Sequence, residues 1–208
     1  MKRLRKKPAD YHHGDLEPAL IAAARAILEK EGIEALSLRA VARTVGVSPA
    51  APYHHFADKD ALLAAVAAEG FRELTAAMEQ RMTRETEPTK RFLGTGAGYV
   101  AFAAANPALF RLMFGGSGLR FSSHADLSMA GMAAYDVLSK AAGEAAIAVG
   151  RDPATIPMTM LTAWSLVHGI AMLILDAEVA PEAFGARDPE ALATRMLDRM
   201  SGKDGLAF

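Results

Sequence analysis

Residues 37–63 carry several side chains that can donate hydrogen bonds to phosphate groups and to base edges. They include Arg39, Tyr53 and Lys59, together with the adjacent imidazoles His54 and His55. Groups of this kind fix a protein on the backbone of a nucleic acid, whereas contacts to base edges read its sequence. The helices that carry these side chains decide whether they can act together on one surface.

Two short helices joined by a glycine turn are predicted around these side chains. Ser37 is a good N-cap for a helix that begins at Leu38, because its hydroxyl can accept a bond from a free amide of the first turn. Gly46 supplies the left-handed residue that ends this helix. Ser48 and Pro49 repeat the start signal, as N-cap and first helical residue. A second helix after so short a turn is typical of a helix-turn-helix.

The order of motifs across residues 11–66 resembles the DNA-binding domain of the TetR family of bacterial transcriptional regulators. A small polar cap is followed by Gly-Val-Ser at 46–48, Pro-Tyr-His-His-Phe at 52–56 and Asp-Lys-Asp-Ala-Leu-Leu at 58–63. The resemblance is specific, since many positions agree in order along one continuous stretch. It implies a three-helix domain whose third helix lies in the major groove. It also implies a homodimer whose two recognition helices enter successive grooves, about 34 Å apart, of a palindromic site.

The same resemblance implies a role for individual residues. Arg39 and Ala50 are expected at base edges, Ala51 can meet a thymine methyl group, and His54 can contact either bases or phosphates. The other expected positions contact phosphates, which fix register without reading sequence: Ser37, Ser48, Tyr53, His55 and Lys59. For each position the alternative is an ordinary solvated surface residue.

Pro52 departs from this pattern. It lacks the amide for the first full intrahelical bond and biases Ala51 away from helical geometry, so we expect a tight or distorted first turn. Ala50, Ala51 and Pro52 also have no side-chain hydrogen-bond donors. Arg39 and the shape of the DNA are therefore expected to supply more of the specificity.

Composition is that of an ordinary soluble globular protein, with 208 residues, 51% hydrophobic and 23% charged, and a net charge of -1. Basic residues concentrate in residues 1–13, which predict a flexible arm that follows a phosphate backbone or enters a minor groove; a solvated tail is the alternative. The chain has no cysteine, which excludes disulfides and thiolate metal sites. No apolar signal segment follows the basic start, so a cytoplasmic protein is expected.

The periodicity predicts an all-α fold. Together with the resemblance, it implies a three-helix helix-turn-helix domain followed by a larger helical domain for ligand binding and dimerisation. We place the helix-turn-helix domain at residues 14–60, a linking helix at 61–87 and the larger domain at 88–208. Asp15, Asp58 and Asp188 are predicted caps, and Gly115 to Gly118 a flexible loop. Outside the helix-turn-helix, helices are predicted over 16–31, 59–85, 89–106, 107–114, 126–149, 157–177 and 189–200.

Trp164, His168 and Gly169, within Trp-Ser-Leu-Val-His-Gly, resemble the signature of one class of TetR-type C-terminal domains. Trp164 and His168 are four residues apart, so they share a helix face and could form a cavity wall. If there is a pocket, its ligand is expected to be mostly apolar, with His168 or Tyr99 giving an orienting hydrogen bond. Core packing is the alternative for the whole candidate set, which comprises Tyr99, Phe102, Phe110, Met113, Phe114, Met129, Met132, Trp164 and His168.

Other patterns favour no further function. Residues 158–175 are apolar, but polar residues interrupt them and basic anchors are lacking, so burial against a partner is preferred to a membrane span. Gly94, Gly96 and Gly98 have the wrong spacing for a dinucleotide loop; they make room for a ligand or a crossing helix, or mark a loose segment. The histidines do not form a converging set of ligands, so no metal or cofactor is expected. No catalytic motif stands out.

Taken together, the residues and the resemblance predict a sequence-specific regulator, a repressor released from a palindromic operator by a small apolar ligand. The helix over 59–85 is the expected lever, with Gly70 a possible weak point in it. The helices over 157–177 and 189–200 are the expected dimer interface, because their apolar faces are too extensive for a monomer. A constitutive or architectural DNA-binding dimer is the alternative, and an enzyme is a remote one.

Overall fold

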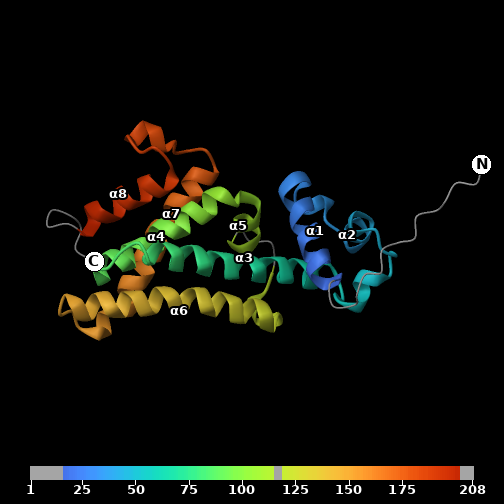
Figure 1. Cartoon of the computed structure of the whole chain (residues 1–208), viewed down its shortest axis with the longest axis horizontal. Helices are drawn as coiled ribbons and strands as arrows, with labels where there is room; N and C mark the ends of the chain where they lie inside the picture. The colour runs from blue at the N-terminus through green and yellow to red at the C-terminus, as the bar shows by residue number, and fades with distance from the viewer. Residues whose placement is uncertain (1–15, 115–118, 202–208) are drawn as a thin grey trace, which may run out of the picture. The chain divides into compact units, whose positions relative to one another are not determined.

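The computed structural model describes residues 16–114 and 119–201, and within them the chain is all-helical, as predicted (Figure 1). The α-helices are α1 Leu16–Glu31, α2 Leu38–Val45, α3 Lys59–Met82, α4 Pro88–Ala105, α5 Pro107–Phe114, α6 Ala125–Ala148, α7 Ile156–Leu175 and α8 Pro189–Ser201. Short 3-10 helices lie between them: η1 Ile33–Ala35, η2 Ala51–His54, η3 Phe121–Ser123, η4 Pro153–Thr155 and η5 Pro181–Phe184. The predicted basic arm at 1–13, the Asp15 cap and the loop at 115–118 lie outside the described residues.

The chain forms two compact units that divide within α3, between Val66 and Ala67. The boundaries expected from sequence, after residues 60 and 87, lie on either side of this division.

The first unit packs α1 against α2 and the start of α3. Gly32 and Gly46 have positive φ angles of 83° and 82° and end α1 and α2 as predicted; Gly46 is in the left-handed helical conformation, with ψ of 27°, whereas ψ of Gly32 is extended at 172°. The core is formed by the apolar residues that the helical spacing placed inward, together with Phe56: Leu20, Ala24, Ile27, Leu28, Leu38, Val41, Ala42, Leu62, Leu63 and Val66.

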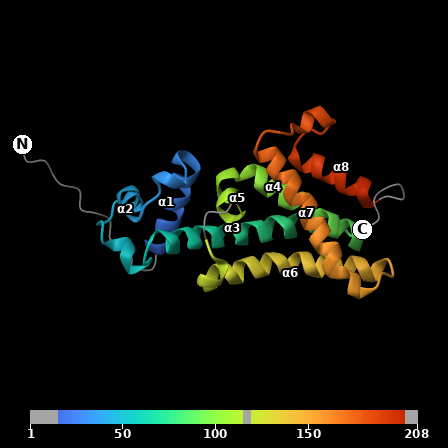
Figure 2. The ribbon, with the colours of Figure 1, turned by 180° about the vertical axis from the view of Figure 1, so that it is seen from behind.

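The second unit is arranged around α4, which packs against α6, α7 and α8 (Figures 1 and 2). Two of the three glycines of α4, Gly96 and Gly98, explain how it can be central. A Cβ atom on Gly98 would lie 2.8 Å from the Ala77 carbonyl oxygen of α3, and one on Gly96 would lie 2.8 Å from Leu197 of α8 and 2.9 Å from Val167 of α7. Of the explanations left open by the sequence, close helix crossing therefore accounts for Gly98, whereas Gly96 lies close to α7 and α8 and also lines a cavity.

Helix α3 buries Phe71, Leu74 and Met78, which follow one another at helical spacing. It is continuous through Gly70, where an added Cβ would lie 2.6 Å from the Met113 sulfur, so this glycine allows α5 to approach. The helix ends at Met82 rather than at residue 85, because the Arg84 and Glu85 amides bond to carbonyls only three residues earlier.

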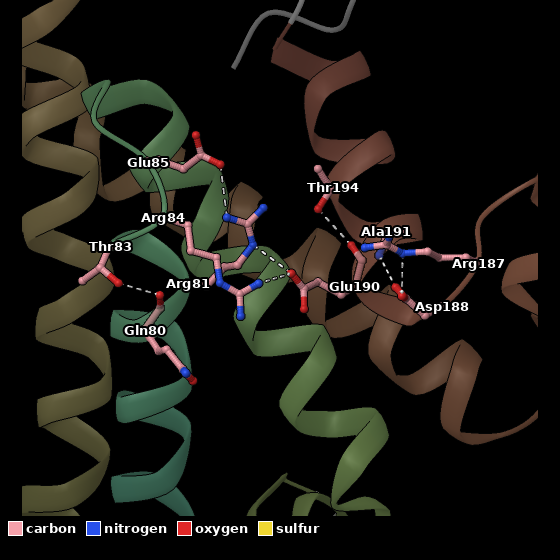
Figure 3. A network of polar contacts seen from close by, with 10 residues as sticks. All are labelled: Gln80, Arg81, Thr83, Arg84, Glu85, Arg187, Asp188, Glu190, Ala191 and Thr194. Atoms are coloured by element: carbon pink, nitrogen blue, oxygen red, sulfur yellow. Dashed lines mark hydrogen bonds and ion pairs between the residues drawn. The ribbon is translucent and has the colours of Figure 1, made fainter.

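A polar network joins the end of α3 to the start of α8 (Figure 3). Glu190 accepts from Arg81 Nε at 2.9 Å and from an Arg84 amino group at 3.2 Å, while Arg81 also pairs with Glu85 at 3.2 Å. Asp188 caps α8 as predicted, accepting from the Ala191 amide at 2.7 Å. This backbone hydrogen bond is the main reason why the pKa of Asp188 lies below its usual range.

Candidate nucleic-acid interface and internal cavity

The start of α2 presents two of the predicted DNA contacts. The Ser37 hydroxyl accepts from the Ala40 amide at 3.1 Å, which makes Ser37 the predicted N-cap. Its hydroxyl proton still leaves one donor for a phosphate. Arg39 is exposed in the first turn of the same helix, and Arg43 and Thr44 are exposed further along it.

The second helix of the predicted pair is a 3-10 helix, η2, and the expectation of an α-helix from Pro49 was wrong. Pro52 has no N–H to bond the Ser48 carbonyl, which instead accepts from Ala51, three residues on, at 3.0 Å. The next bond, from the Tyr53 amide to the Ala50 carbonyl at 3.2 Å, keeps the three-residue spacing. The tight first turn expected from Pro52 is therefore confirmed.

The surface of η2 combines small apolar groups with two polar rings. Ser48, Ala50, Tyr53 and His54 are exposed, Ala51 is half-buried, and Pro52 is buried in the unit. Pro49, which sequence reasoning used only as a helix start, is also exposed. Together with α2, this surface offers hydroxyl, imidazole and guanidinium groups around a patch of small apolar side chains.

His55 and Lys59, both expected on phosphates, are engaged within the unit. His55 Nδ1 lies 3.3 Å from a carboxylate oxygen of Glu17 in the first turn of α1. Lys59 Nζ donates to the Ile33 carbonyl of η1 at 2.9 Å. An ammonium has three donors, so Lys59 can hold η1 and still reach a phosphate. Sequence reasoning missed Glu17 and Ile33, because no local pattern pairs residues so far apart in the chain.

The second unit contains a cavity of about 550 Å³. Helices α3, α4, α6 and α7 supply most of its wall. Among the predicted pocket residues it is lined by Tyr99, Phe114, Met132 and Trp164. The wall also includes residues that sequence reasoning had placed only in the core, or not at all: Phe71, Leu74, Met78, Phe92, Leu93, Phe121, Tyr135 and Leu161.

The remaining predicted pocket residues lie elsewhere. Phe102, Phe110 and Met113 are buried but do not line the cavity, and Met129 is 65% exposed on α6. His168 is behind the cavity wall, where its ring contacts Phe110 and Phe114. Helical spacing predicts which residues point towards the protein interior. It does not predict whether an inward-pointing side chain packs against other side chains or lines a cavity.

A chain of hydrogen bonds runs from the cavity wall to His168. Trp164 Nε1 donates to the Tyr99 oxygen at 3.4 Å, and this oxygen lies 2.9 Å from His168 Nδ1. Burial raises the pKa of Tyr99, and burial also lowers the pKa of His168, so both groups are neutral near pH 7. In these neutral states Tyr99 can donate to an unprotonated Nδ1, with the imidazole proton on Nε2.

Two other expectations concern metals and membranes. Within residues 16–114 and 119–201, no group of three or more His, Asp or Glu side chains is placed to hold a metal ion.

Pro153–Leu175 is long and apolar enough to cross a membrane, by length and composition only. Much of this segment is exposed in the single chain, including Met158, Leu161 and Leu173.

Comparison with family models assigns both halves of the chain. Residues 20–66 match the model of bacterial regulatory proteins of the TetR family, and residues 92–200 match a tetracyclin repressor-like C-terminal domain. No curated protein sequence matches the chain.

Solved structures share the fold over nearly the whole chain. A protein of unknown function from Rhodococcus sp. RHA1 is 35% identical, with a TM-score of 0.76 over 92% of this chain and 96% of its own. A TetR family regulatory protein from Rhodococcus RHA1 is 24% identical, with a TM-score of 0.63 over 88% and 93% of the two chains. The TetR family regulator PfmR from Thermus thermophilus is 19% identical, with a TM-score of 0.61 over 86% and 94%.

Proposed function

Because the chain belongs to the TetR family of bacterial transcriptional regulators, we propose that it is a repressor released from a palindromic operator by a small, mostly apolar ligand. The family makes the chain a DNA-binding transcriptional regulator. The repressor role, the operator symmetry and the ligand belong to the proposal.

The observation that carries the ligand proposal is the cavity of the second unit. Its volume of about 550 Å³ falls in the range of roughly 300–1,000 Å³ typical of small-molecule sites. Apolar and aromatic side chains dominate its wall, and a few polar groups are available to orient a ligand.

Helix α3 is the proposed lever between ligand and DNA. Phe71, Leu74 and Met78 of α3 line the cavity, and the same helix begins at Lys59, a proposed phosphate contact. A ligand that packs better against one position of α3 than another shifts the balance between two states, by no more than its difference in affinity for them. In the released state, the spacing between the two DNA-binding units of the dimer does not match the spacing of successive major grooves.

On the DNA side, we propose that Arg39 and Ala50 face base edges and that Ala51 meets a thymine methyl group. Ser37, Ser48, Tyr53, His55 and Lys59 hold phosphates, and His54 contacts either bases or phosphates. The exposure of Arg39, Ala50 and Tyr53 supports these roles. The apolar surface of α7 supports a homodimer, and the family supports a cytoplasmic location.

Two measurements test the proposal. Bound sites are first determined across the genome, and a duplex of the recovered site and a scrambled duplex are compared by fluorescence anisotropy. Equal affinity for both duplexes would contradict a specific regulator. A thermal-shift screen with apolar metabolites then tests the cavity, because a bound ligand stabilises the fold by mass action.

Release is tested by repeating the anisotropy titration with any stabilising compound. The proposal predicts weaker operator binding in its presence. A compound that stabilises the protein without changing operator affinity would contradict ligand-controlled release. If no apolar compound stabilises the protein, the constitutive dimer is the better explanation.

A further inference from the structure

We propose that the cavity selects an uncharged ligand that carries a hydroxyl group, and that this hydroxyl bridges the Trp164 indole nitrogen and the Tyr99 phenol oxygen. The inference rests on the proposed ligand function and adds the chemical class of the ligand.

The cavity wall, as far as the structure describes it, contains no acidic, basic or imidazole side chain. Its polar side chains are two hydroxyls, Thr95 and Ser128, two phenols, Tyr99 and Tyr135, and the Trp164 indole. Thr95 donates its proton to the Phe92 carbonyl at 2.7 Å, so that donor is already used. An ionised ligand group would lose its water here without gaining an opposite charge, which is costly. The wall therefore favours a neutral ligand.

Trp164 and Tyr99 have complementary bonding capacity left over. The bond between Trp164 Nε1 and the Tyr99 oxygen, at 3.4 Å, is longer than the usual 2.7–3.2 Å range for such bonds. In the proposed arrangement Tyr99 donates its own proton to His168 Nδ1, 2.9 Å away, and its oxygen then serves the ligand as an acceptor. The pair thus presents one weakly engaged donor and one acceptor.

A hydroxyl group fits this pair because it both accepts and donates. It can accept from Trp164 Nε1 and donate to the Tyr99 oxygen, replacing one long bond with two. An ether or ketone can only accept from Trp164, and a carboxylate has no proton for Tyr99. The neutral states of Tyr99 and His168 maintain this arrangement, since Tyr99 must keep its proton to donate to Nδ1.

A quaternary ammonium is the strongest competitor, because Phe71, Phe92, Tyr99, Phe121 and Trp164 are among the aromatic residues of the wall. Cation–π attraction to these rings would favour such a ligand. This attraction does not compensate for the hydration that a cation loses on entering the cavity. No carboxylate lines the described wall to pair with the charge. The hydroxyl bridge also uses the Trp164 and Tyr99 polar atoms, which a quaternary ammonium cannot bond.

The test uses four probes that share one apolar body and differ only in the head group: decanol, decyl methyl ether, decanoate and decyltrimethylammonium. The same four head groups are repeated on a naphthyl body, so that a poor fit of the linear chain does not decide the result. Binding to the full-length protein is measured by calorimetry and thermal shift at pH 7.

The alcohol is expected to bind tightest on at least one body, about fivefold or more above its methyl ether, which matches a net hydrogen bond of about 1 kcal/mol. Tighter binding of the carboxylate or the ammonium overturns the hydroxyl assignment and leaves the ligand cavity supported. Absence of binding by all eight probes overturns both the assignment and its underlying ligand proposal.

Variants locate the hydroxyl. Tyr99→Phe should remove the preference for alcohol over ether while leaving binding of the ether unchanged, because both head groups can then only accept from Trp164. Trp164→Phe should weaken binding of both the alcohol and the ether, because both accept from its Nε1. Tyr135→Phe is the matched control, because Tyr135 lines the same cavity but is 51% exposed on α6 and lies outside the Trp164–Tyr99–His168 chain. Trp164 is 43% exposed, so its replacement tests the bridge even if the buried Tyr99 variant unfolds. Unchanged binding of both the alcohol and the ether to a folded Trp164→Phe protein overturns the proposal.

Discussion

We expect Arg39 to discriminate between DNA sequences. It is exposed in the first turn of α2, whereas the nearby Ala50, Ala51 and Pro52 of the recognition segment have no side-chain hydrogen-bond donors. Arg39→Ala should therefore reduce the preference for operator over scrambled duplex by about 1–3 kcal/mol in an anisotropy titration. Arg43→Ala is the control, because it removes the same charge from an exposed position of the same helix. Equal loss of preference in both variants would contradict a base contact by Arg39.

The apolar residues of the recognition segment lead to a second prediction, about the DNA. Pro49 and Ala50 are exposed and Ala51 is half-buried, so this surface can contact thymine methyl groups in the major groove. Replacing thymine by deoxyuridine within the half-sites removes only that methyl group. Each contacted methyl should cost about 0.8 kcal/mol, or roughly fourfold in affinity. Deoxyuridine placed outside the half-sites serves as control, and an affinity that does not respond to either substitution would exclude methyl readout.

At the scale of elements, the glycines of α4 determine how closely the helices of the second unit can pack. A Cβ on Gly98 would lie 2.8 Å from a backbone oxygen of α3, which cannot move aside without shifting the helix, whereas one on Gly94 would make ordinary contacts of 3.5–3.6 Å. Gly98→Ala should destabilise the protein by about 1–3 kcal/mol through overpacking. Gly94→Ala should be neutral, or stabilising by up to about 1 kcal/mol through helix propensity. Thermal denaturation of the two variants measures the difference, and equal melting temperatures would argue against close packing at Gly98.

Elements whose signals are local could be predicted from sequence. The caps at Ser37, Asp58 and Asp188 and the left-handed Gly46 are confirmed, because each is decided by atoms within a few residues. Pro52 predicted a tight turn for the same reason, because a proline affects only the backbone hydrogen bonds near it. Its full effect, a 3-10 helix in place of the expected α-helix, was not anticipated.

Features that join distant segments could not be predicted. The contacts of Lys59 with Ile33 and of His55 with Glu17 depend on tertiary packing, which helical spacing does not predict. The cavity shows the same limit, since Tyr99 and Trp164 line it while the equally apolar and inward-facing Phe102 and Phe110 are packed core. Whether a wall faces space or side chains depends on several helices at once.

For the whole molecule, the exposed surface of α7 is the feature that the single chain leaves unexplained. Met158, Leu161 and Leu173 are each about half exposed or more on one helix. A second hollow of about 520 Å³ lies beside α7, η5 and α8, lined by Leu173 and Phe184 among others. Large exposed apolar surfaces of this kind mark interaction sites. A symmetric dimer through α7 and α8 would bury this surface and supply the second recognition element that a palindromic operator requires.

Leu173→Glu tests this interface directly. Leu173 is 47% exposed and does not line the cavity of about 550 Å³, so the new carboxylate should leave the fold and the ligand site intact. In the proposed dimer it would place a charged group from each protomer in the apolar interface, which should destabilise the dimer. Sedimentation equilibrium should show a monomer. Operator affinity should fall by roughly 100-fold or more, because two linked half-site contacts become one. Ile147→Glu is the matched control, since Ile147 is 75% exposed on α6, outside the proposed interface. Dimers of unchanged stability in Leu173→Glu, or dissociation of the Ile147→Glu protein, would place the interface elsewhere.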